Sequence, residues 1–409
     1  MRSTPRLVLH VGAMKTGTTY LQNVLQANGP ALRDAGWSVP GQDDVVRATR
    51  QLLDVAGPAV ELGGARPDVA ASPRWTALLD DARVHGARGG RGTVVSMEFL
   101  SFLRAGGVQA VVAGAEGLEV HVVLTVRDAV RALPSQWQSL TRNAFGHSWP
   151  DFATSVRTVM QGEPDPVARP FLRTQRIPRM VTAWATSVPR ERFTVVTVPD
   201  ASAGLPRDLV WRRLCDVLDV DPATTSTAAS FDNPQLGYGS CELLRRVNVE
   251  LAMPAERPYR KVMRRLSHEH LLPLRAQQGR HRLDQATARL AVRLNRRTLA
   301  AVAEHATLVG DPADLPGDLD GRHDLDPGDR PVDPPATEVR DAAEALWRGG
   351  RELCAELGLA LRPELAAELP DATPDAVRQV AGVVAVAITG DESHRLPTRA
   401  ANGPTVTAT

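Results

Sequence analysis

The sequence predicts a three-layer α/β fold, in which a mostly parallel central sheet is flanked by helices, with a helical part added at the C-terminal end. Two observations predict this fold class. Four apolar, β-branched runs in the first half of the chain are nearly continuous, as strands covered on both faces are. Segments with helical periodicity lie between these runs, and such alternation is typical of a parallel sheet.

The expected elements follow in order along the chain. Strands are predicted at 7–11, 93–97, 120–126 and 193–198, and helices in this half at 18–28, 75–84 and 130–140. From about residue 231 the pattern becomes helical, with apolar residues three and four apart in 241–251, 283–305 and 337–357.

Composition shifts divide the chain into five expected regions. The α/β domain spans 1–250, and 251–309 is a helical extension of it. The segment 310–336 is rich in Asp, Gly and Pro and is interpreted as a linker. A helical segment at 337–389 and a disordered tail at 390–409 complete the chain.

Bulk properties limit the classes of partner. The 409-residue chain has a formal net charge of +1, which gives no reason to expect nucleic acid or a membrane surface as a partner. No apolar run is long enough to span a membrane, and only six residues precede the first strand, so we expect no secretory signal and a cytoplasmic location. The cysteines at 215, 241 and 354 have no metal-binding or redox spacing, and no metal is predicted.

The first predicted strand runs into a loop, Gly12-Ala13-Met14-Lys15-Thr16-Gly17-Thr18-Thr19, and then into a helix. Such a P-loop-like connection directs backbone N–H groups at one spot in front of a helix N-terminus, where an anion is favoured. Lysine occurs at only two positions in this arginine-rich chain, 15 and 261, which makes Lys15 conspicuous.

The position of Lys15 differs from that in a nucleotide triphosphatase loop. There the lysine follows the second glycine, and the next hydroxyl holds Mg²⁺. Here Thr18 follows Gly17, and the lysine lies inside the loop. An ammonium there can lie beside a 5′-phosphate without a metal, and transfer of a singly charged sulfuryl group does not need the cation clamp of phosphoryl transfer.

At these residues the chain resembles the sulfotransferases that use 3′-phosphoadenosine 5′-phosphosulfate, in particular bacterial members with a similar His10–Gln22 loop. The resemblance implies that Lys15, Thr16, Gly17, Thr18 and Thr19 hold the 5′-phosphosulfate. It also implies that Lys15 stabilises the charge on the departing phosphate oxygen.

A second element supports the same resemblance. The strand 122–126 ends in Arg127-Asp128, and Ser135 lies on the helix that follows. In the family an arginine and a serine in these places grip the 3′-phosphate, and a guanidinium fork suits a dianion. On the residues alone, Arg127 and Asp128 also fit a surface ion pair in which Asp128 caps the helix.

Glu98 follows the predicted strand 93–97 and is the first candidate for the catalytic base. Its Ser96-Met97-Glu98 setting resembles a bacterial pattern, although a capping or loop glutamate also fits the residues. Four histidines remain alternative candidates for the base: His10, His85, His121 and His147. Of these, His10 and His121 lie in or beside predicted strands and fit a role in the core better.

The sequence therefore predicts a sulfotransferase that transfers a sulfuryl group to a hydroxyl or amine of a small-molecule or glycan acceptor, with 3′,5′-ADP as the nucleotide product. One alternative is a P-loop kinase that uses ATP and Mg²⁺, for which Asp128 offers an acid at a strand end. Another is a degenerate nucleotide-binding or scaffold protein. Turnover with candidate acceptors separates the last from an active enzyme.

Overall fold

The computed structural model describes residues 4–55, 68–200, 204–228, 235–371 and 373–393. The chain divides into two compact units. Each unit combines separate stretches: unit 1 contains 1–136, 152–233 and 282–331, and unit 2 contains 137–151, 234–281 and 332–409. The domain boundaries predicted from the sequence assume contiguous segments, whereas the two units interleave along the chain.

Unit 1 is built on an all-parallel sheet of six described strands in the order β2-β3-β1-β4-β5-β6, which confirms the predicted α/β fold class. Four strands match the predicted runs to within one residue at either end: β1 (Arg6–His10), β3 (Gly92–Ser96), β4 (Glu119–Arg127) and β5 (Phe193–Val198). The edge strands β2 (Trp37–Ser38) and β6 (Thr307–Val309) were not predicted, because they are too short to form an apolar run.

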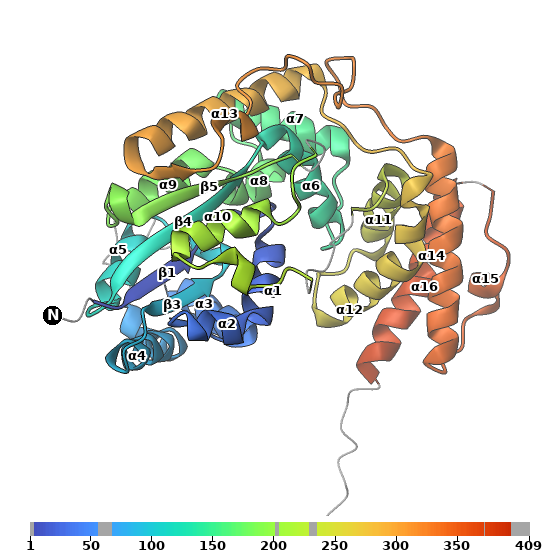
Figure 1. Ribbon diagram of the computed structural model, residues 1–409. Coiled ribbons are helices and arrows are strands. Elements are labelled where there is room, and N and C mark those ends of the chain that lie inside the picture. Colours follow the sequence, from blue (N-terminus) through green and yellow to red (C-terminus); the bar gives the residue numbers. More distant parts are fainter. Residues whose placement is uncertain (1–3, 56–67, 201–203, 229–234, 372, 394–409) are drawn as a thin grey trace, which may run out of the picture. The chain divides into compact units, whose positions relative to one another are not determined.

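Helices cover both faces of this sheet, so the predicted three-layer arrangement is confirmed (Figure 1). On β1, Leu7 and Leu9 contact one helical layer, and Val8 contacts the other. The first layer contains α3 (Gln42–Val55), α4 (Pro73–Ala87), α5 (Ala105–Gly114), α9 (Ile177–Ala185) and α13 (Gln285–His305). The second contains α1 (Thr18–Ala27), α2 (Gly29–Asp34) and α10 (Leu209–Leu218).

Burial on both faces explains the continuous apolar runs in the sequence. Each fully buried aliphatic side chain stabilises the fold by about 1.5–3 kcal/mol, so every position along a central strand favours an apolar residue.

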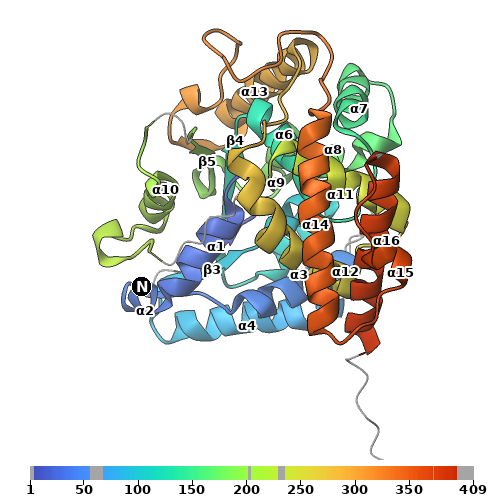
Figure 2. The ribbon, with the colours of Figure 1, turned by 90° about the vertical axis from the view of Figure 1, so that its right-hand side faces the viewer.

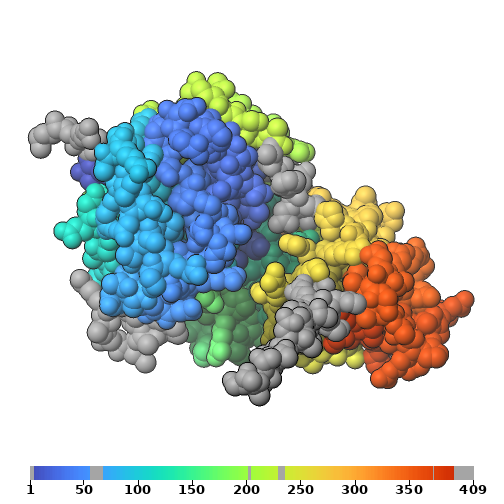
Figure 3. Space-filling view, turned by 90° about the horizontal axis from the view of Figure 1, so that it is seen from below, coloured from blue at the N-terminus to red at the C-terminus, as the bar shows by residue number. Residues whose placement is uncertain are grey.

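Seen from below, α2, α3 and α4 form one surface of unit 1, coloured blue to light blue in Figure 3.

The segment expected to be a linker is bound to unit 1 as far as Pro331. The Arg322 guanidinium pairs with the buried Asp128 carboxylate directly after β4. The Asn295 side-chain amide of α13 donates to Asp128 Oδ1 (2.8 Å) and to the Pro316 carbonyl (2.9 Å). Arg213 donates to Asp314 Oδ2 (2.7 Å). Apart from the buried Leu315 and Leu325, mainly polar contacts hold this segment, which is why its composition resembles that of a linker.

Unit 2 is helical in its described residues. Its helices are α11 (Tyr238–Leu251), α12 (Arg257–Leu266), α14 (Ala336–Glu356), α15 (Pro363–Ala366) and α16 (Thr373–Ser393). Figures 1 and 2 show α11, α14 and α16 side by side, and α11 and α14 match two predicted helices. Helices α6 (Ala129–Thr141) and α7 (Trp149–Gln161) each begin in one unit and end in the other.

Three further sequence predictions concern the C-terminal end, the membrane and the cysteines. The predicted tail begins at 390, but α16 continues to Ser393, and 394–409 lie outside the described residues. None of the described helices combines the length and apolarity needed to cross a bilayer. All three cysteines are buried free thiols.

Replacing Arg322 tests whether the Asp/Gly/Pro-rich segment is part of unit 1. Arg322→Ala leaves the Asp128 carboxylate buried without its closest cation, and we expect the free energy of unfolding to fall by about 3 kcal/mol in urea titrations. The control Arg289→Ala removes an exposed ion pair with Asp329 and should cost at most about 1 kcal/mol. Equal losses in the two variants would contradict a tightly packed segment.

Candidate functional site

The predicted site residues of unit 1 lie at the carboxyl edge of the sheet. Strand β1 is central, with β3 on one side and β4 on the other. The glycine-bounded loop follows β1, Glu98 begins the short 3-10 helix η3 (Glu98–Phe102) after β3, and Arg127 is the last residue of β4. Ligands of open parallel sheets bind at this edge, and the chain direction of β1 puts its loop between the other two positions.

Backbone hydrogen bonds attach the loop to β4, which extends beyond the end of β1. The Ala13 amide donates to the Thr125 carbonyl (2.8 Å), and the Thr125 amide donates to the Gly12 carbonyl (2.5 Å). The Thr125 hydroxyl also donates to the Gly12 carbonyl (2.8 Å). The first half of the loop is therefore held as an irregular continuation of the sheet.

Thr16 directs its side chain into this support. Its hydroxyl donates to the Ala13 carbonyl (2.6 Å) and lies 2.5 Å from Thr125 Oγ1. Because that hydroxyl is engaged inside the loop, only the backbone of Thr16 remains available to a ligand.

The backbone amides that follow are available. Among the described residues, the N–H groups of Thr16, Gly17, Thr18 and Thr19 have no acceptor. They surround the start of α1, where the helix dipole adds positive potential. This arrangement of amides binds an anion such as phosphate or sulfate.

The loop adopts unusual backbone angles to present these amides. Gly12 and Gly17 have φ values of 107° and 83°, and half-buried Lys15 has a φ of 67°. Glycine is favoured at the first two positions, whereas a lysine in the left-handed region costs free energy. A strained lysine beside free amides is typical of a binding loop.

Arg127 lies on the same face of β4 as Thr125. Side chains alternate along a strand, so Leu124 and Val126 pack into one helical layer, while Arg127, two residues beyond Thr125, belongs to the opposite face. The Arg127 Nε atom is buried and has no hydrogen-bond partner in the described structure. Burial lowers the pKa of Arg127, and the nearby charge of Arg131 lowers it further, whereas the charges of Asp128 and Asp200 partly offset this effect.

Other cations engage the carboxylates around Arg127. Asp128 pairs with Arg322 and caps α6 by accepting from the Val130 amide (3.1 Å). Asp200 pairs with Arg131. The sequence left open an ion pair between Arg127 and Asp128, but no such pair occurs among the described residues, and the half-buried Arg127 keeps a positive charge that an anion would balance.

Ser135 lies on α6, directly after this strand end, and is half-buried. No hydrogen bond joins Ser135 to Arg127 in the part of the chain that the structure describes. The structure therefore brings the two residues to consecutive elements but does not connect their side chains.

Glu98 lies on the other side of the loop, against Gly12. A Cβ atom added to Gly12 would lie 3.2 Å from both Cα and Cβ of Glu98. The Gln22 side-chain amide of α1 donates to Glu98 Oε2 (2.8 Å), which fixes the carboxylate beside the loop. Glu98 is half-buried, and a carboxylate in such a position can accept a proton from a nucleophile.

The histidines fit a structural role better than that of a base. His10 is fully buried, with Nδ1 2.7 Å from Ser96 Oγ and Nε2 3.3 Å from Thr125 Oγ1, and burial lowers its pKa to about 4. His85 Nε2 contacts the Gly36 carbonyl (3.0 Å), and His121 Nε2 contacts Glu119 (3.1 Å) near the amino end of β4. His147 belongs to unit 2.

Sequence reasoning gave no role to three residues that build the site. Thr125 supports the loop, Gln22 orients Glu98, and Gln175 donates from its side-chain amide to the Met14 carbonyl (2.9 Å). Thr125 had a usable signal, since it is a polar residue inside an apolar strand. Gln175 had none, because a distant segment brings it to the loop.

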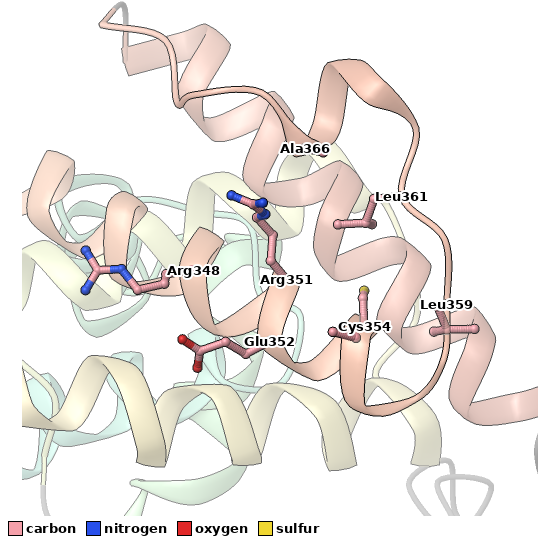
Figure 4. A pocket seen from close by; sticks show the side chains of 8 residues that line it. Arg348, Arg351, Glu352, Cys354, Leu359, Leu361 and Ala366 are labelled. Carbon is pink, nitrogen blue, oxygen red and sulfur yellow. The ribbon is translucent and has the colours of Figure 1, made fainter.

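Unit 2 contains a separate cavity of about 450 Å³, between α14 and the segment that follows it (Figure 4). Cys354, Leu359 and Leu361 supply apolar atoms to its wall, and Arg348 and Arg351 lie at its edge. Burial raises the pKa of the Cys354 thiol, which disfavours the reactive thiolate. None of the site residues predicted from the sequence lines this cavity.

Comparison with known proteins gives limited similarity. No family model and no curated protein sequence matches the chain. Among solved structures, the chain is similar to a sulfotransferase from Alicyclobacillus acidocaldarius, with 20% sequence identity and a TM-score of 0.35. The similarity covers 56% of this chain and 87% of that one.

The structural role of His10 predicts a pH dependence of stability. The folded-state pKa is about 4, below the usual 6.5, so only the unfolded chain binds a proton between these values, and stability is lost as the pH falls through this window. From pH 7 to pH 5, the free energy of unfolding of the wild type should fall by roughly 2 kcal/mol more than that of His10→Gln. Parallel pH profiles in urea titrations would show that His10 is not buried and neutral.

Proposed function

We propose that this protein is a sulfotransferase that transfers a sulfuryl group from 3′-phosphoadenosine 5′-phosphosulfate to a hydroxyl or amine. The observation that carries the proposal is the Arg127 guanidinium, whose buried Nε lacks a partner among the described residues, at the strand end beside the loop. Together with the free amides at the start of α1, it supports two anion sites at the sheet edge instead of one.

Two anion sites fit a nucleotide with phosphates at both its 5′ and 3′ positions. The amides of Thr16, Gly17, Thr18 and Thr19 and the Lys15 side chain would hold the 5′-phosphosulfate, and Arg127 with Ser135 would hold the 3′-phosphate. ATP has no 3′-phosphate, so its binding would leave the Arg127 charge buried without an anion, which is costly.

When bound, the donor supplies an activated sulfuryl group. The oxygen or nitrogen of the acceptor attacks sulfur, and Glu98 accepts the proton that this hydroxyl or amine loses. Gln22 holds the carboxylate in place during this transfer. Lys15 and the loop amides stabilise the negative charge that develops on the phosphate oxygen when its bond to sulfur breaks.

The kinase alternative requires an acid at a strand end to hold Mg²⁺ through its carboxylate. Asp128 was the candidate, but its oxygens are engaged by Arg322, Asn295 and the Val130 amide. A metal at this position would have to displace a buried ion pair. The geometry therefore favours the metal-independent transfer of a sulfuryl group.

Nucleotide binding tests the proposed pocket. Wild-type protein should bind 3′,5′-ADP without Mg²⁺ and more tightly than 5′-AMP or ATP in calorimetric titrations. Arg127→Ala should weaken 3′,5′-ADP binding by about 10- to 100-fold, because a charged hydrogen bond is lost, and should leave 5′-AMP binding nearly unchanged.

A matched control is Arg88→Ala, which removes an exposed arginine that follows α4, at the opposite edge of the sheet. It should bind both nucleotides as the wild type does. Preference of the wild type for ATP with Mg²⁺, or an equal loss of both nucleotides in Arg127→Ala, would overturn the assignment of the 3′-phosphate site.

Turnover tests the role of Glu98. With ³⁵S-labelled donor and a mixture of hydroxyl and amine acceptors, Glu98→Gln should lower kcat by about 10²- to 10⁴-fold, because the general base is lost. Its affinity for 3′,5′-ADP should not change. Glu119→Gln, which alters a half-buried glutamate at the amino end of β4, serves as control. Wild-type kcat in Glu98→Gln would rule out this glutamate as the base.

A further inference from the structure

Arginines gather beside the proposed base, on elements that the nucleotide pocket does not use. Helix α8 (Arg169–Thr174) packs against η3, which begins at Glu98. The Arg173 guanidinium carbon lies 4.2 Å from the centre of the Phe102 ring. Phe102 in turn stacks on Phe99, the residue after Glu98, with ring centres 5.5 Å apart. A cationic and aromatic surface therefore adjoins Glu98.

Two more arginines come from the start of α9. Arg176 caps this helix, Arg179 lies in its first turn, and Gln175 contacts the loop carbonyl of Met14. Because α9 leads into β5, its first turn lies at the carboxyl edge of the sheet. The arginines, the loop and Glu98 thus share one edge of unit 1.

The charge of a fourth arginine, Arg104, lies close to the charges of Arg176 and Arg179. Arg104 caps α5, and burial lowers its pKa, which the charges of Arg179 and Arg176 lower further. Cations at a helix N-terminus also oppose the helix dipole. The chain therefore brings like charges close together at this edge of the sheet.

Among the described residues, no carboxylate pairs with Arg173, Arg176 or Arg179. From 166 to 190 the sequence has five arginines and no acidic residue. Within the described part of the chain, Arg173, Arg176 and Arg179 form no ion pair, whereas Arg131, Arg213 and Arg322 each pair with an aspartate. In a chain with a net charge of +1, an unbalanced cluster beside the base indicates a site for an external anion.

We infer that the acceptor is itself anionic, and that Arg173, Arg176 and Arg179 bind its carboxylate or sulfate group while Phe99 and Phe102 contact its apolar face. This inference rests on the proposed function and names the class of acceptor for the same site. The cluster selects an acid over the matched neutral molecule and guides it toward Glu98.

A pair of probes that differ in one charge tests the inference. Protein saturated with 3′,5′-ADP is titrated with p-nitrophenyl β-D-glucuronide and with the neutral p-nitrophenyl β-D-glucoside, and a 6-sulfated glucoside distinguishes sulfate from carboxylate. At least one anionic probe should bind about 10-fold more tightly than the glucoside, as expected for a charge-assisted hydrogen bond. In Arg173→Glu/Arg179→Glu, in which two exposed arginines are replaced, this preference should disappear.

The control is Arg33→Glu/Arg88→Glu, which reverses two exposed charges near the amino edge of the sheet. It has the same net charge as the test variant and should keep the preference. Equal binding of the three probes, no binding of any, or an equal loss in the control would overturn the inference. Failure to bind 3′,5′-ADP in the first step would instead overturn the proposed function.

Discussion

The hydrogen bonds between Gly12, Ala13 and Thr125 are the constraint on which the rest of the site depends. They extend the sheet beyond the end of β1 and fix the loop against β4. Thr125 therefore sets the distance between the loop amides and Arg127, which lies two residues further along the same strand. The same threonine contacts Thr16 and His10, so the core and the loop share one network. This support allows Lys15 to keep its strained backbone angle.

At the carboxyl edge of the sheet, the aspartates form ion pairs with other arginines, and Arg127 forms none among the described residues. The chain as a whole is almost neutral. Locally, Asp128 pairs with Arg322 and Asp200 pairs with Arg131. Arg127 keeps its positive charge for this reason, and the segment that supplies Arg322 has a role in the site although it lies far from it in sequence. The net charge therefore said nothing about this edge, where local pairing decides the potential.

The sheet could be predicted because burial on both faces leaves a strong signal. The runs that became β1, β3, β4 and β5 are continuous and apolar, whereas β2 and β6 are too short to leave one. The sequence predicts a linker at 310–336 because mainly polar contacts such as Arg213–Asp314 hold its part in unit 1, and polar contacts have no periodicity. The interleaving of the two units also has no local signal, because it depends on which segments pack together.

The candidate site likewise contains residues that a local sequence pattern indicates and residues that no such pattern indicates. The strand–loop–helix pattern indicated the loop amides and Lys15. The positions of Glu98 and Arg127 at the ends of predicted strands indicated these two residues. Gln22 and Gln175 act through contacts between segments distant in sequence, so no spacing rule pointed to them. The sequence also could not tell that the Thr16 hydroxyl is engaged by the loop, because that depends on how β4 continues past β1.

A crystal structure of the protein with 3′,5′-ADP tests the central claim most directly, since it locates both phosphates at once. We expect the 5′-phosphate on the amides of Thr16 to Thr19 and the 3′-phosphate within hydrogen-bond distance of the Arg127 guanidinium. A 3′-phosphate in solvent, with Arg127 still lacking an anion, would contradict this claim.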